Sequence, residues 1–321
     1  MCILDILVIS WLSKFFKLRH YPLFMYDVII IGGGAAGLSA AIYSARKNLK
    51  TAIISESFGG LISYSSNVEN YLGTKAIPGY ELSQKFLKHA EEYEIDFKEE
   101  KVSELKKIDS SFIVFGQKEY HAKSVIIATG SKPRKLGIPG EKEFSGKGVI
   151  YCTTCDGPMF AGLDVAVIGS GNSGLDSVIQ LMPIAKHIYL IEAADQLFGD
   201  KALQDKILGN SKVTIMTNTK TKEIIGTKEM EKLKVDVNGK EKLLDVQGVS
   251  INIGYIPDTS VFHIVQKNER GEIIINNKNE TNVPGIFAAG DCSDVPEKQV
   301  IIAAGEGAKA AISAFKYLAK N

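Results

Sequence analysis

The sequence has little cysteine and almost no net charge, and both shortages limit what the chain can be. Four cysteines in 321 residues do not suit a small secreted fold held together by disulfides, so we expect a reducing, cytoplasmic compartment. The 38 basic and 37 acidic residues leave a formal net charge of +1. This argues against nucleic acid as the main partner, because such proteins usually carry a basic face. At this length, two domains are the expected number.

The first 24 residues contain no apolar run long enough to cross a membrane. The stretch from Ile3 to Leu12 includes Asp5 and is shorter than the roughly 20 residues of a transmembrane helix. Basic residues follow this run, whereas in a secretory signal they precede it. Residues 1–24 are therefore either an amphipathic helix on a membrane surface or an N-terminal extension outside the native protein, with Met25 as the natural start. We favour the second interpretation and expect no membrane contact.

A dinucleotide-binding pattern begins directly after this extension. A continuous apolar run at 28–31 leads into a glycine-rich turn at 32–37 and an alanine-rich helix at 38–47, and a second strand at 51–54 ends beside Glu56. Strand, glycine turn, helix, strand and acid within about thirty residues are typical of a dinucleotide-binding unit. In such a unit the turn approaches a pyrophosphate at the helix N-terminus, and the acid binds a ribose hydroxyl.

The same order of elements recurs in the second half of the chain. A strand at 165–168 leads into a glycine turn at 169–174 and a helix at 175–182, and the next strand, at 188–191, ends at Glu192. Two such units imply two dinucleotides on one polypeptide.

Glycine–proline corners separate the two units. One corner spans residues 130–133 and the other spans 254–257, and the tail after the second corner again reads as a strand and helix of the first unit. We therefore predict an α/β fold of two Rossmann-like dinucleotide-binding domains, one inserted in the other. The expected boundaries are 25–132 with 257–321 for the outer domain and 133–256 for the inserted domain.

The inserted domain begins near a C-x-x-C motif formed by Cys152 and Cys155. Cysteines at this spacing can close a small disulfide, and the spacing tends to lower one thiol pKa. Asp156 follows at once and could exchange protons with the sulfurs. A zinc site would need a second pair of ligands. Because the other two cysteines, Cys2 and Cys292, are isolated, we predict a redox site and no metal.

In this order, the motifs resemble those of the thioredoxin reductase family of flavoproteins from Tyr26 onward. The shared landmarks are G-x-G-x-x-G at 32–37, V-E-N-Y at 68–71, A-T-G at 128–130, C-T-T-C-D-G at 152–157, G-x-G-N-S-G at 169–174 and A-G-D at 289–291. Three further stretches are similar to the flavoprotein part of alkyl hydroperoxide reductase, namely 56–60, 155–158 and 298–310. That part also carries a thioredoxin-like N-terminal region, which we expect to be missing because 24 residues cannot supply one.

The resemblance implies a role for each site residue. The residues implied to bind FAD are Gly32, Gly34, Ala36, Gly37, Glu56, Gly59, Gly60, Asn70, Thr129, Gly130, Asp291, Gln299 and Val300. Those implied to bind the nicotinamide nucleotide are Gly169, Gly171, Asn172, Ser173, Gly174 and Glu192. Cys155 is expected to face the flavin, Cys152 to attack the partner disulfide and Asp156 to donate protons. The resemblance also implies a homodimer, and an inserted domain that turns so that nicotinamide and cysteines alternate at the flavin.

The residues after the strand at 188–191 indicate which nucleotide is used. NADPH-dependent members of the family carry a basic cluster there, whereas this chain reads E-A-A-D-Q from Glu192. A carboxylate can accept a hydrogen bond from a free 2′-hydroxyl and would repel a phosphate. We therefore predict NADH rather than NADPH. An alternative is that reduced ferredoxin supplies the electrons, against which the intact second glycine turn argues.

Together these features predict an FAD-dependent thioredoxin-disulfide reductase. Hydride from NADH would pass through the flavin and the Cys152–Cys155 disulfide to a small thioredoxin- or glutaredoxin-like protein. The alternatives are an NADH oxidase, a reductase component of a peroxiredoxin system, a ferredoxin-fed thioredoxin reductase, and a flavoprotein scaffold without turnover.

Overall fold

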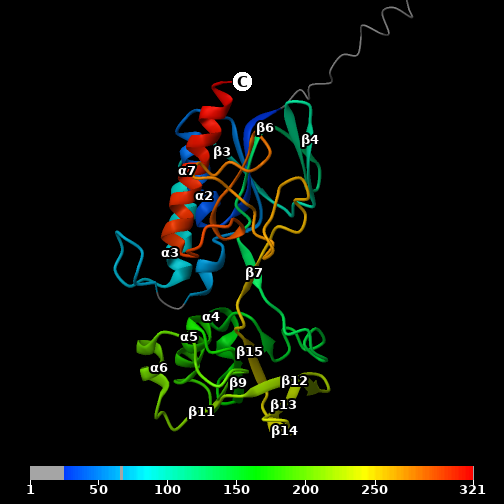
Figure 1. Cartoon of the computed structure of the whole chain (residues 1–321). Coiled ribbons are helices and arrows are strands. Elements are labelled where there is room, and N and C mark those ends of the chain that lie inside the picture. The colour runs from blue at the N-terminus through cyan, green and yellow to red at the C-terminus, as the bar shows by residue number, and fades with distance from the viewer. Residues whose placement is uncertain (1–24, 66–67, 321) are drawn as a thin grey trace, which may run out of the picture.

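The computed structural model describes residues 25–65 and 68–320, so the predictions for residues 1–24 lie outside the described part of the chain. Two sheets form the centres of two halves of the molecule (Figure 1). The first sheet has the strand order β3-β2-β1-β6-β5-β4, and a further strand, β17, also pairs with β6. Its strands are β1 (Tyr26–Gly33), β2 (Thr51–Phe58), β3 (Ile95–Glu99), β4 (Glu104–Ile108), β5 (Ser111–Phe115), β6 (Glu119–Ile127) and β17 (Ile286–Ala288).

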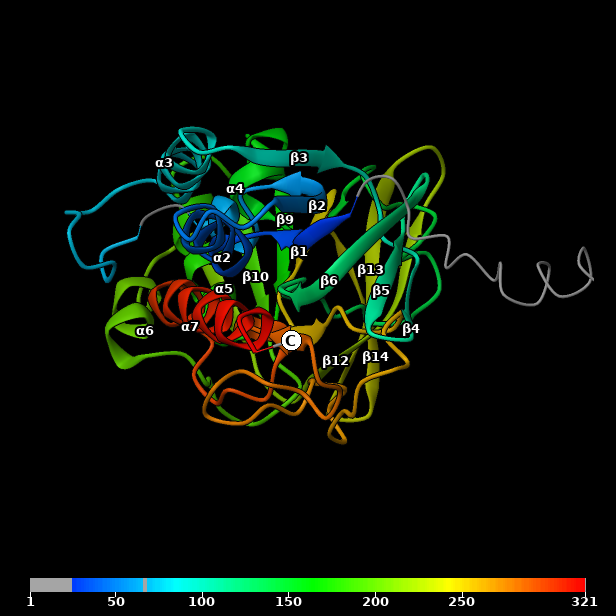
Figure 2. The same cartoon turned by 90° about the horizontal axis from the view of Figure 1, so that it is seen from above.

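Strand β1 is buried on both faces because its side chains alternate between two apolar layers. Val28 and Ile30 point to the layer that is covered by α2 (Ala35–Ala45), α3 (Gly79–Glu91) and α7 (Val300–Leu318). Figure 2 shows these helices together on one side of the sheet. Helix α7 lies directly on α2, since a Cβ atom added at Gly307 would be only 2.0 Å from the carbonyl oxygen of Ala36.

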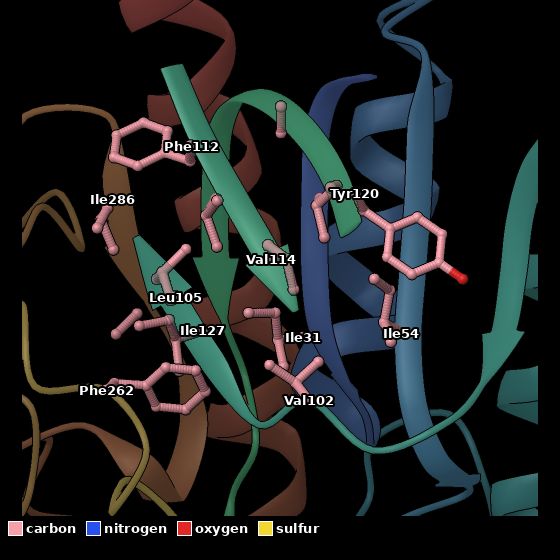
Figure 3. Packing of buried hydrophobic residues seen from close by; sticks show 14 of the residues in the cluster. Ile31, Ile54, Val102, Leu105, Phe112, Val114, Tyr120, Ile127, Phe262 and Ile286 are labelled. Carbon is pink, nitrogen blue, oxygen red and sulfur yellow. The ribbon is translucent and has the colours of Figure 1, made fainter. Parts of the chain in front are cut away.

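The opposite layer holds the alternate residues of the same strands. Ile31 and Ile127 of the central strands pack there with Phe112 of β5 and Phe262 from the chain after the inserted domain (Figure 3). Both faces of these parallel strands are covered by other parts of the chain. A ligand can therefore reach β1 and β6 only at their carboxyl ends.

The second sheet is parallel throughout, with the order β11-β10-β9-β15-β8, whereas β4, β5 and β6 of the first sheet pair antiparallel. Its strands are β8 (Val149–Ile150), β9 (Asp164–Ile168), β10 (His187–Ile191), β11 (Val213–Met216) and β15 (Gly248–Ile251). Helices α5 (Asn172–Leu181) and α6 (Lys201–Ile207) cover one face. A three-stranded antiparallel sheet of β12 (Thr219–Gly226), β13 (Met230–Val237) and β14 (Lys240–Asp245) packs on the other. The predicted α/β fold with two dinucleotide-binding domains is therefore confirmed.

A short antiparallel ribbon joins the two halves (Figure 1). It consists of β7 (Ser131–Pro133) and β16 (Tyr255–Pro257), with Ser131 opposite Pro257. Both strands follow glycines with positive φ, 68° at Gly130 and 91° at Gly254. The two predicted glycine–proline corners are thus neighbours in space, and the predicted boundaries near 132 and 257 fall within this ribbon.

Some elements differ from the sequence prediction in extent. Strand β2 continues to Phe58, beyond the predicted end at Ile54, because a register shift lets Phe58 pair with Gly33. Strands β13 and β14 form a hairpin across Asn238 and Gly239, and both residues have the positive φ that such a turn requires. Among the described residues, no helix is both long and apolar enough to span a membrane.

The remaining elements are short. They are α4 (Thr153–Asp156) and the 3-10 turns η1 (Leu61–Tyr64), η2 (Gly157–Phe160) and η3 (Gly290–Cys292). Both α4 and η2 belong to the inserted half, whereas η1 and η3 belong to the outer half.

Candidate functional site

A cavity of about 1450 Å³ lies where the two halves meet. This exceeds the roughly 300–1,000 Å³ of pockets that hold drug-sized ligands, so it has room for a dinucleotide. The outer domain contributes the first glycine turn, η1, and the loops after β6 and β17. The inserted domain contributes Ser173 at the start of α5, and the ribbon contributes Tyr255 and Ile256. The cavity is therefore shared between both domains.

The first glycine turn is shaped for a ligand at its middle glycine. Gly32 has φ of +116°, and a Cβ there would lie 2.2 Å from the Ala128 carbonyl oxygen. A Cβ at Gly37 would lie 1.8 Å from the Gly32 carbonyl oxygen, so this glycine lets α2 pack against the turn. Gly34 faces the cavity, and no side chain caps α2. The uncapped N–H groups at this helix start can therefore bind an anion such as a pyrophosphate.

The residues predicted to bind FAD line this cavity, with Gly37 as the exception because it is packed beneath the turn. Asn70 and Gln299, which are 229 positions apart, meet there, and the Asn70 Nδ2 donates to Gln299 Oε1 at 3.2 Å. These residues come from the loop after η1 and from the N-cap of α7. The uncapped N–H groups of α2 and these side-chain amides are polar donors of the kind that can bind a dinucleotide such as FAD.

Asp291 of η3 is a partly buried carboxylate that lines this cavity. Desolvation raises the pKa of Asp291, while Lys298 and a hydrogen bond from Ser131 act in the opposite direction. Lys298 is itself paired with Glu272, whose Oε1 lies 3.0 Å from the lysine Nζ, and it also donates to the Ser293 carbonyl oxygen. The sequence motifs did not single out Glu272, because its partner is distant in the chain.

Glu56 lies at an open end of the same cavity. Its Oε1 is 2.8 Å from the Nζ of Lys101, and both side chains are more than half exposed. The hydrogen bond from Lys101 lowers the pKa of Glu56. Sequence reasoning missed Lys101, which faces Glu56 only because β2 extends past its predicted end and the chain after β3 passes beside it.

The second glycine turn repeats the construction of the first. A Cβ at Gly169 would lie 2.2 Å from the Asn252 carbonyl oxygen, and one at Gly174 would lie 1.9 Å from the Gly169 carbonyl oxygen. Around Gly171 there is open space, and no side chain caps α5. The middle glycine is thus again the position at which a phosphate can approach the backbone.

Glu192 is fastened to this second turn by three hydrogen bonds. Its Oε2 accepts from the Ser170 N–H at 3.0 Å and from the Ser170 hydroxyl at 2.7 Å. Its Oε1 accepts from the Ala194 N–H at 3.0 Å. Oε1 accepts only one of these bonds and retains a lone pair, so a ribose hydroxyl can still donate to it.

The other two polar residues of the second turn have different neighbours. Asn172 binds Asp200, donating from Nδ2 to the carboxylate at 2.9 Å and accepting from its N–H at 2.7 Å. Ser173 is hydrogen-bonded to the hydroxyl of Tyr255. Burial raises the pKa of Tyr255, while its bond to Ser173 acts in the opposite direction. Ser173 therefore belongs to the second turn and to the wall of the large cavity.

Cys152 immediately precedes α4, is partly buried and is disulfide-bonded. The prediction for the Cys155 side chain lies outside what the structure describes. Asp156 is exposed, and its N–H donates to the Cys152 carbonyl oxygen at 3.0 Å. Neither Cys152 nor Asp156 lines the large cavity. In this domain arrangement the second glycine turn, through Ser173, adjoins the cavity.

Two threonines hold the short helix α4 in place. Thr153 is buried, and its hydroxyl is 2.7 Å from that of Ser250 on β15. The Thr154 hydroxyl bonds Gln180 at 2.9 Å and also donates to the Tyr64 carbonyl oxygen of η1. Helix α4 is therefore anchored in its own domain and touches the outer domain. Among the described residues, no group of three or more histidine, cysteine or acidic side chains is arranged to hold a metal.

Comparison with known proteins connects both halves to one family. The family described as pyridine nucleotide-disulphide oxidoreductase matches residues 26–307. Alkyl hydroperoxide reductase of Staphylococcus aureus has a subunit that is 44% identical over 302 residues, which cover 92% of this chain and 60% of that protein. The chain thus spans about 60% of the length of this curated relative.

Solved structures match over nearly their whole length. Thioredoxin reductase from T. acidophilum is 38% identical with a TM-score of 0.85, covering 91% of this chain and 98% of that one. Lactococcus lactis thioredoxin reductase in its FR conformation is 32% identical with a TM-score of 0.87, covering 92% and 100%. Because such scores include the relative placement of the two halves, the domain arrangement is also similar.

Proposed function

The chain belongs to the pyridine nucleotide-disulphide oxidoreductase family, and from this premise we propose that it is a flavin-dependent disulfide reductase that uses NADH to reduce a small thioredoxin- or glutaredoxin-like protein. Membership of the family makes it an oxidoreductase and implies that it binds FAD and a pyridine nucleotide. We further propose which nucleotide is preferred, which class of partner is reduced and which residues carry out each step.

One observation carries the proposal. A single cavity is lined by residues of the first glycine turn and by Ser173 of the second, while Cys152, disulfide-bonded, sits on the inserted domain at a helix that touches η1. When bound, FAD would supply a ring that accepts hydride and passes electrons to a disulfide. The first turn, Asn70, Asp291 and Gln299 would hold it.

The protein's own contribution to the second half-reaction is thiol–disulfide exchange. Once the pair is reduced, the Cys152 thiolate attacks one sulfur of the partner disulfide and displaces the other as a thiolate, forming a mixed disulfide. The second thiol of the pair then attacks Cys152, which releases the partner as a dithiol and restores the internal disulfide. Asp156 is exposed beside the pair and can deliver a proton to the departing thiolate.

The choice of NADH rests on the charges around Glu192. No basic residue occurs between Glu192 and Lys201, and the Lys201 Nζ is already 2.9 Å from Asp205. A 2′-phosphate would therefore meet carboxylates without a free cation, whereas a 2′-hydroxyl can donate to Glu192. Anaerobic bleaching of the flavin tests this: NADH should act at lower concentration than NADPH, and faster bleaching by NADPH would contradict the assignment.

A cysteine substitution tests the disulfide chemistry. Cys152→Ser should lower reduction of a thioredoxin disulfide at least about 1,000-fold, because serine cannot form the mixed disulfide, while NADH-driven reduction of ferricyanide persists. The matched control is Cys292→Ala, since Cys292 is a buried free thiol outside the disulfide, and it should behave as wild type. If Cys152→Ser still reduces thioredoxins, or wild type passes electrons only to oxygen, the proposal is wrong.

Other parts of the proposal come from the same family likeness. We assign 25–132 with 257–321 to the FAD-binding domain and 133–256 to the nicotinamide-binding domain, with the β7–β16 ribbon as the hinge. A homodimer in the cytoplasm completes the proposed picture. Light scattering of the purified protein would give twice the mass of 34.9 kDa if the dimer forms, and the single-chain mass if it does not.

A further inference from the structure

The loop between β10 and α6 presents an aromatic ring to solvent beside the second glycine turn. Phe198 in this loop is 62% exposed. Its neighbour Leu197 points the other way and packs against the buried cluster under α5 and α6. The loop is thus anchored on one side by Leu197, while the larger side chain of Phe198 is left outside every buried apolar cluster of the described residues.

Although the ring is exposed, the backbone that carries it is fixed to the turn. The Phe198 N–H donates to the Ser170 hydroxyl oxygen at 3.2 Å, and the Gly199 N–H donates to the Ser170 carbonyl oxygen at 2.7 Å. A Cβ at Gly199 would lie 2.2 Å from a methyl carbon of Leu175, so the loop packs directly on the start of α5. Asp200 and Asn172 add two more hydrogen bonds to the same junction.

The Ser170 hydroxyl group links the backbone of Phe198 to Glu192, the acid predicted to bind a ribose. The Ser170 hydroxyl, which accepts from Phe198, itself donates to Glu192 Oε2 at 2.7 Å. Phe198 and Glu192 therefore lie at the same mouth of the turn, beyond the carboxyl ends of β9 and β10. In this kind of unit the pyrophosphate lies at the helix start and the acid binds the adenosine ribose, so the base lies next to that acid.

The surroundings of Phe198 favour a flat, uncharged ligand group. Single exposed apolar side chains are common on protein surfaces, but the backbone that carries this one is hydrogen-bonded to the predicted nucleotide-binding turn. Its loop carries the acids Asp195 and Asp200 and no base, so it would repel a phosphate. An aromatic side chain offers a face on which any nucleobase can stack.

We propose that Phe198 is the platform on which the adenine ring of NADH stacks, and that together with Glu192 it selects an adenosine without a 2′-phosphate. This inference rests on the proposed use of NADH and adds the residue that binds the far end of the nucleotide. Stacking accounts for affinity, whereas the acid and the absence of cations account for the choice between the two nucleotides.

Binding of fragments of NADH tests the stacking role of Phe198 independently of hydride transfer. In FAD-loaded Phe198→Ala, the Kd for ADP-ribose, measured by calorimetry, should rise roughly 5- to 100-fold, the usual range for loss of one base stack. Nicotinamide mononucleotide, which has no adenine, should bind as it does to wild type. The KM for NADH should rise in parallel with the Kd for ADP-ribose, while kcat at saturating NADH stays the same.

Two further variants keep the test sharp. Phe198→Trp should retain affinity, and its indole fluorescence should be quenched by ADP-ribose; the only other tryptophan is Trp11, so Phe198→Ala supplies the background signal. The matched control is Leu208→Ala, which removes an exposed apolar side chain (48%) at the far end of α6 and should leave both Kd values unchanged.

The outcomes distinguish the two levels of the proposal. If wild type binds NADH and ADP-ribose but Phe198→Ala binds ADP-ribose equally well, the stacking role is overturned and the proposed function stands. An unquenched tryptophan in Phe198→Trp overturns the role in the same way. If wild type binds neither compound, both the stacking role and the use of NADH are overturned.

Discussion

The two glycine turns, residues 32–37 and 169–174, have nearly the same backbone construction. The Cβ that alanine would add at Gly37 and at Gly174 would lie 1.8 and 1.9 Å from the carbonyl oxygen of the first glycine of its own turn. In both turns the first glycine has a positive φ, and its added Cβ would lie 2.2 Å from a carbonyl oxygen of a neighbouring strand's end. The repeat seen in the sequence therefore corresponds to two turns in which equivalent glycines make equivalent close contacts with backbone carbonyl oxygens.

The turns differ in what surrounds them. The first opens into the large cavity, and its acid, Glu56, is exposed and paired with Lys101. The second turn has its acid, Glu192, tied back by Ser170, and an exposed Phe198 beside it. We therefore propose that the glycines let a dinucleotide approach, and that residues outside the glycine motif select which nucleotide binds. The following predictions test that division.

The largest effect is expected from filling the packed glycine of the first turn. In Gly37→Ala the new methyl group would overlap the Gly32 carbonyl oxygen, so α2 must move away from β1 at a cost of about 1–3 kcal/mol or more. Flavin absorbance per protein should fall about tenfold or more. The matched control is Gly305→Ala in α7, where a Cβ meets nothing within 4 Å. A yellow Gly37→Ala protein with full flavin content would contradict this account.

The equivalent change in the second turn should affect the use of NADH without affecting the binding of FAD. Gly174→Ala has the same overlap, with the Gly169 carbonyl oxygen, but it lies in the inserted domain. The variant should keep its flavin and lose most of its NADH-driven bleaching, about tenfold or more by the same strain. Stopped-flow absorbance under nitrogen measures this, and loss of flavin instead would show that the turns are not independent.

Removing the charge of Glu192 should have a moderate effect on nucleotide choice. In Glu192→Gln a charge-assisted hydrogen bond, about 1.5–3 kcal/mol, is replaced by a weaker neutral one. The KM for NADH should rise about tenfold and the preference over NADPH should narrow. The matched control is Glu241→Gln, an exposed acid on β14 of the same domain and outside this loop, which should leave both unchanged. An unaltered ratio of NADH to NADPH use in Glu192→Gln would disprove the role of this acid.

A smaller effect concerns pH and Asp291. Because burial raises its pKa, the folded protein binds this proton more tightly than the unfolded chain does, and stability falls as pH rises through the raised pKa. Asp291→Asn removes this dependence. For flavin-free protein, the Tm of the variant should equal that of wild type in acid, below the ordinary aspartate pKa, and exceed it at neutral pH. A variant that melts lower at neutral pH would show that the carboxylate is stabilised in the fold.

The smallest effect is expected at Glu56. Its ion pair with Lys101 joins two exposed side chains, and such pairs are worth about 0–1 kcal/mol and weaken with salt. Glu56→Gln should therefore change flavin content less than about fivefold, which is smaller than the rise of about tenfold in the KM for NADH expected from Glu192→Gln. Equal losses from Glu56→Gln and Glu192→Gln in their respective ligands would remove the contrast between the turns.

The sequence was sufficient for the parts of the molecule governed by local rules. Apolar runs buried on both faces, glycines that no other residue could replace, and glycine–proline corners each follow from short-range sterics, so the two domains and both turns could be predicted. Asn70 and Gln299 were each assigned to FAD binding only through the family resemblance. Their hydrogen bond was not predicted, because the two residues are far apart in the chain.

Contacts that depend on domain placement could not be predicted. The hydrogen bond between Ser173 and Tyr255, and that between Thr154 and Tyr64, exist only in the observed arrangement of the halves. Phe198 was missed for another reason: an isolated phenylalanine in a loop carries no periodic signal, and its significance comes from the hydrogen bond between its N–H and Ser170.

The central claim is that electrons pass from NADH at the second turn, through the flavin at the first turn, to the cysteine pair. An anaerobic NADH titration of the flavin-loaded protein tests this claim most directly. Wild type should consume about two equivalents of NADH before the flavin is fully bleached, because flavin and disulfide each take two electrons. Cys152→Ser should need about one. Identical end points for the two proteins, or no bleaching of wild type by NADH, would contradict the claim.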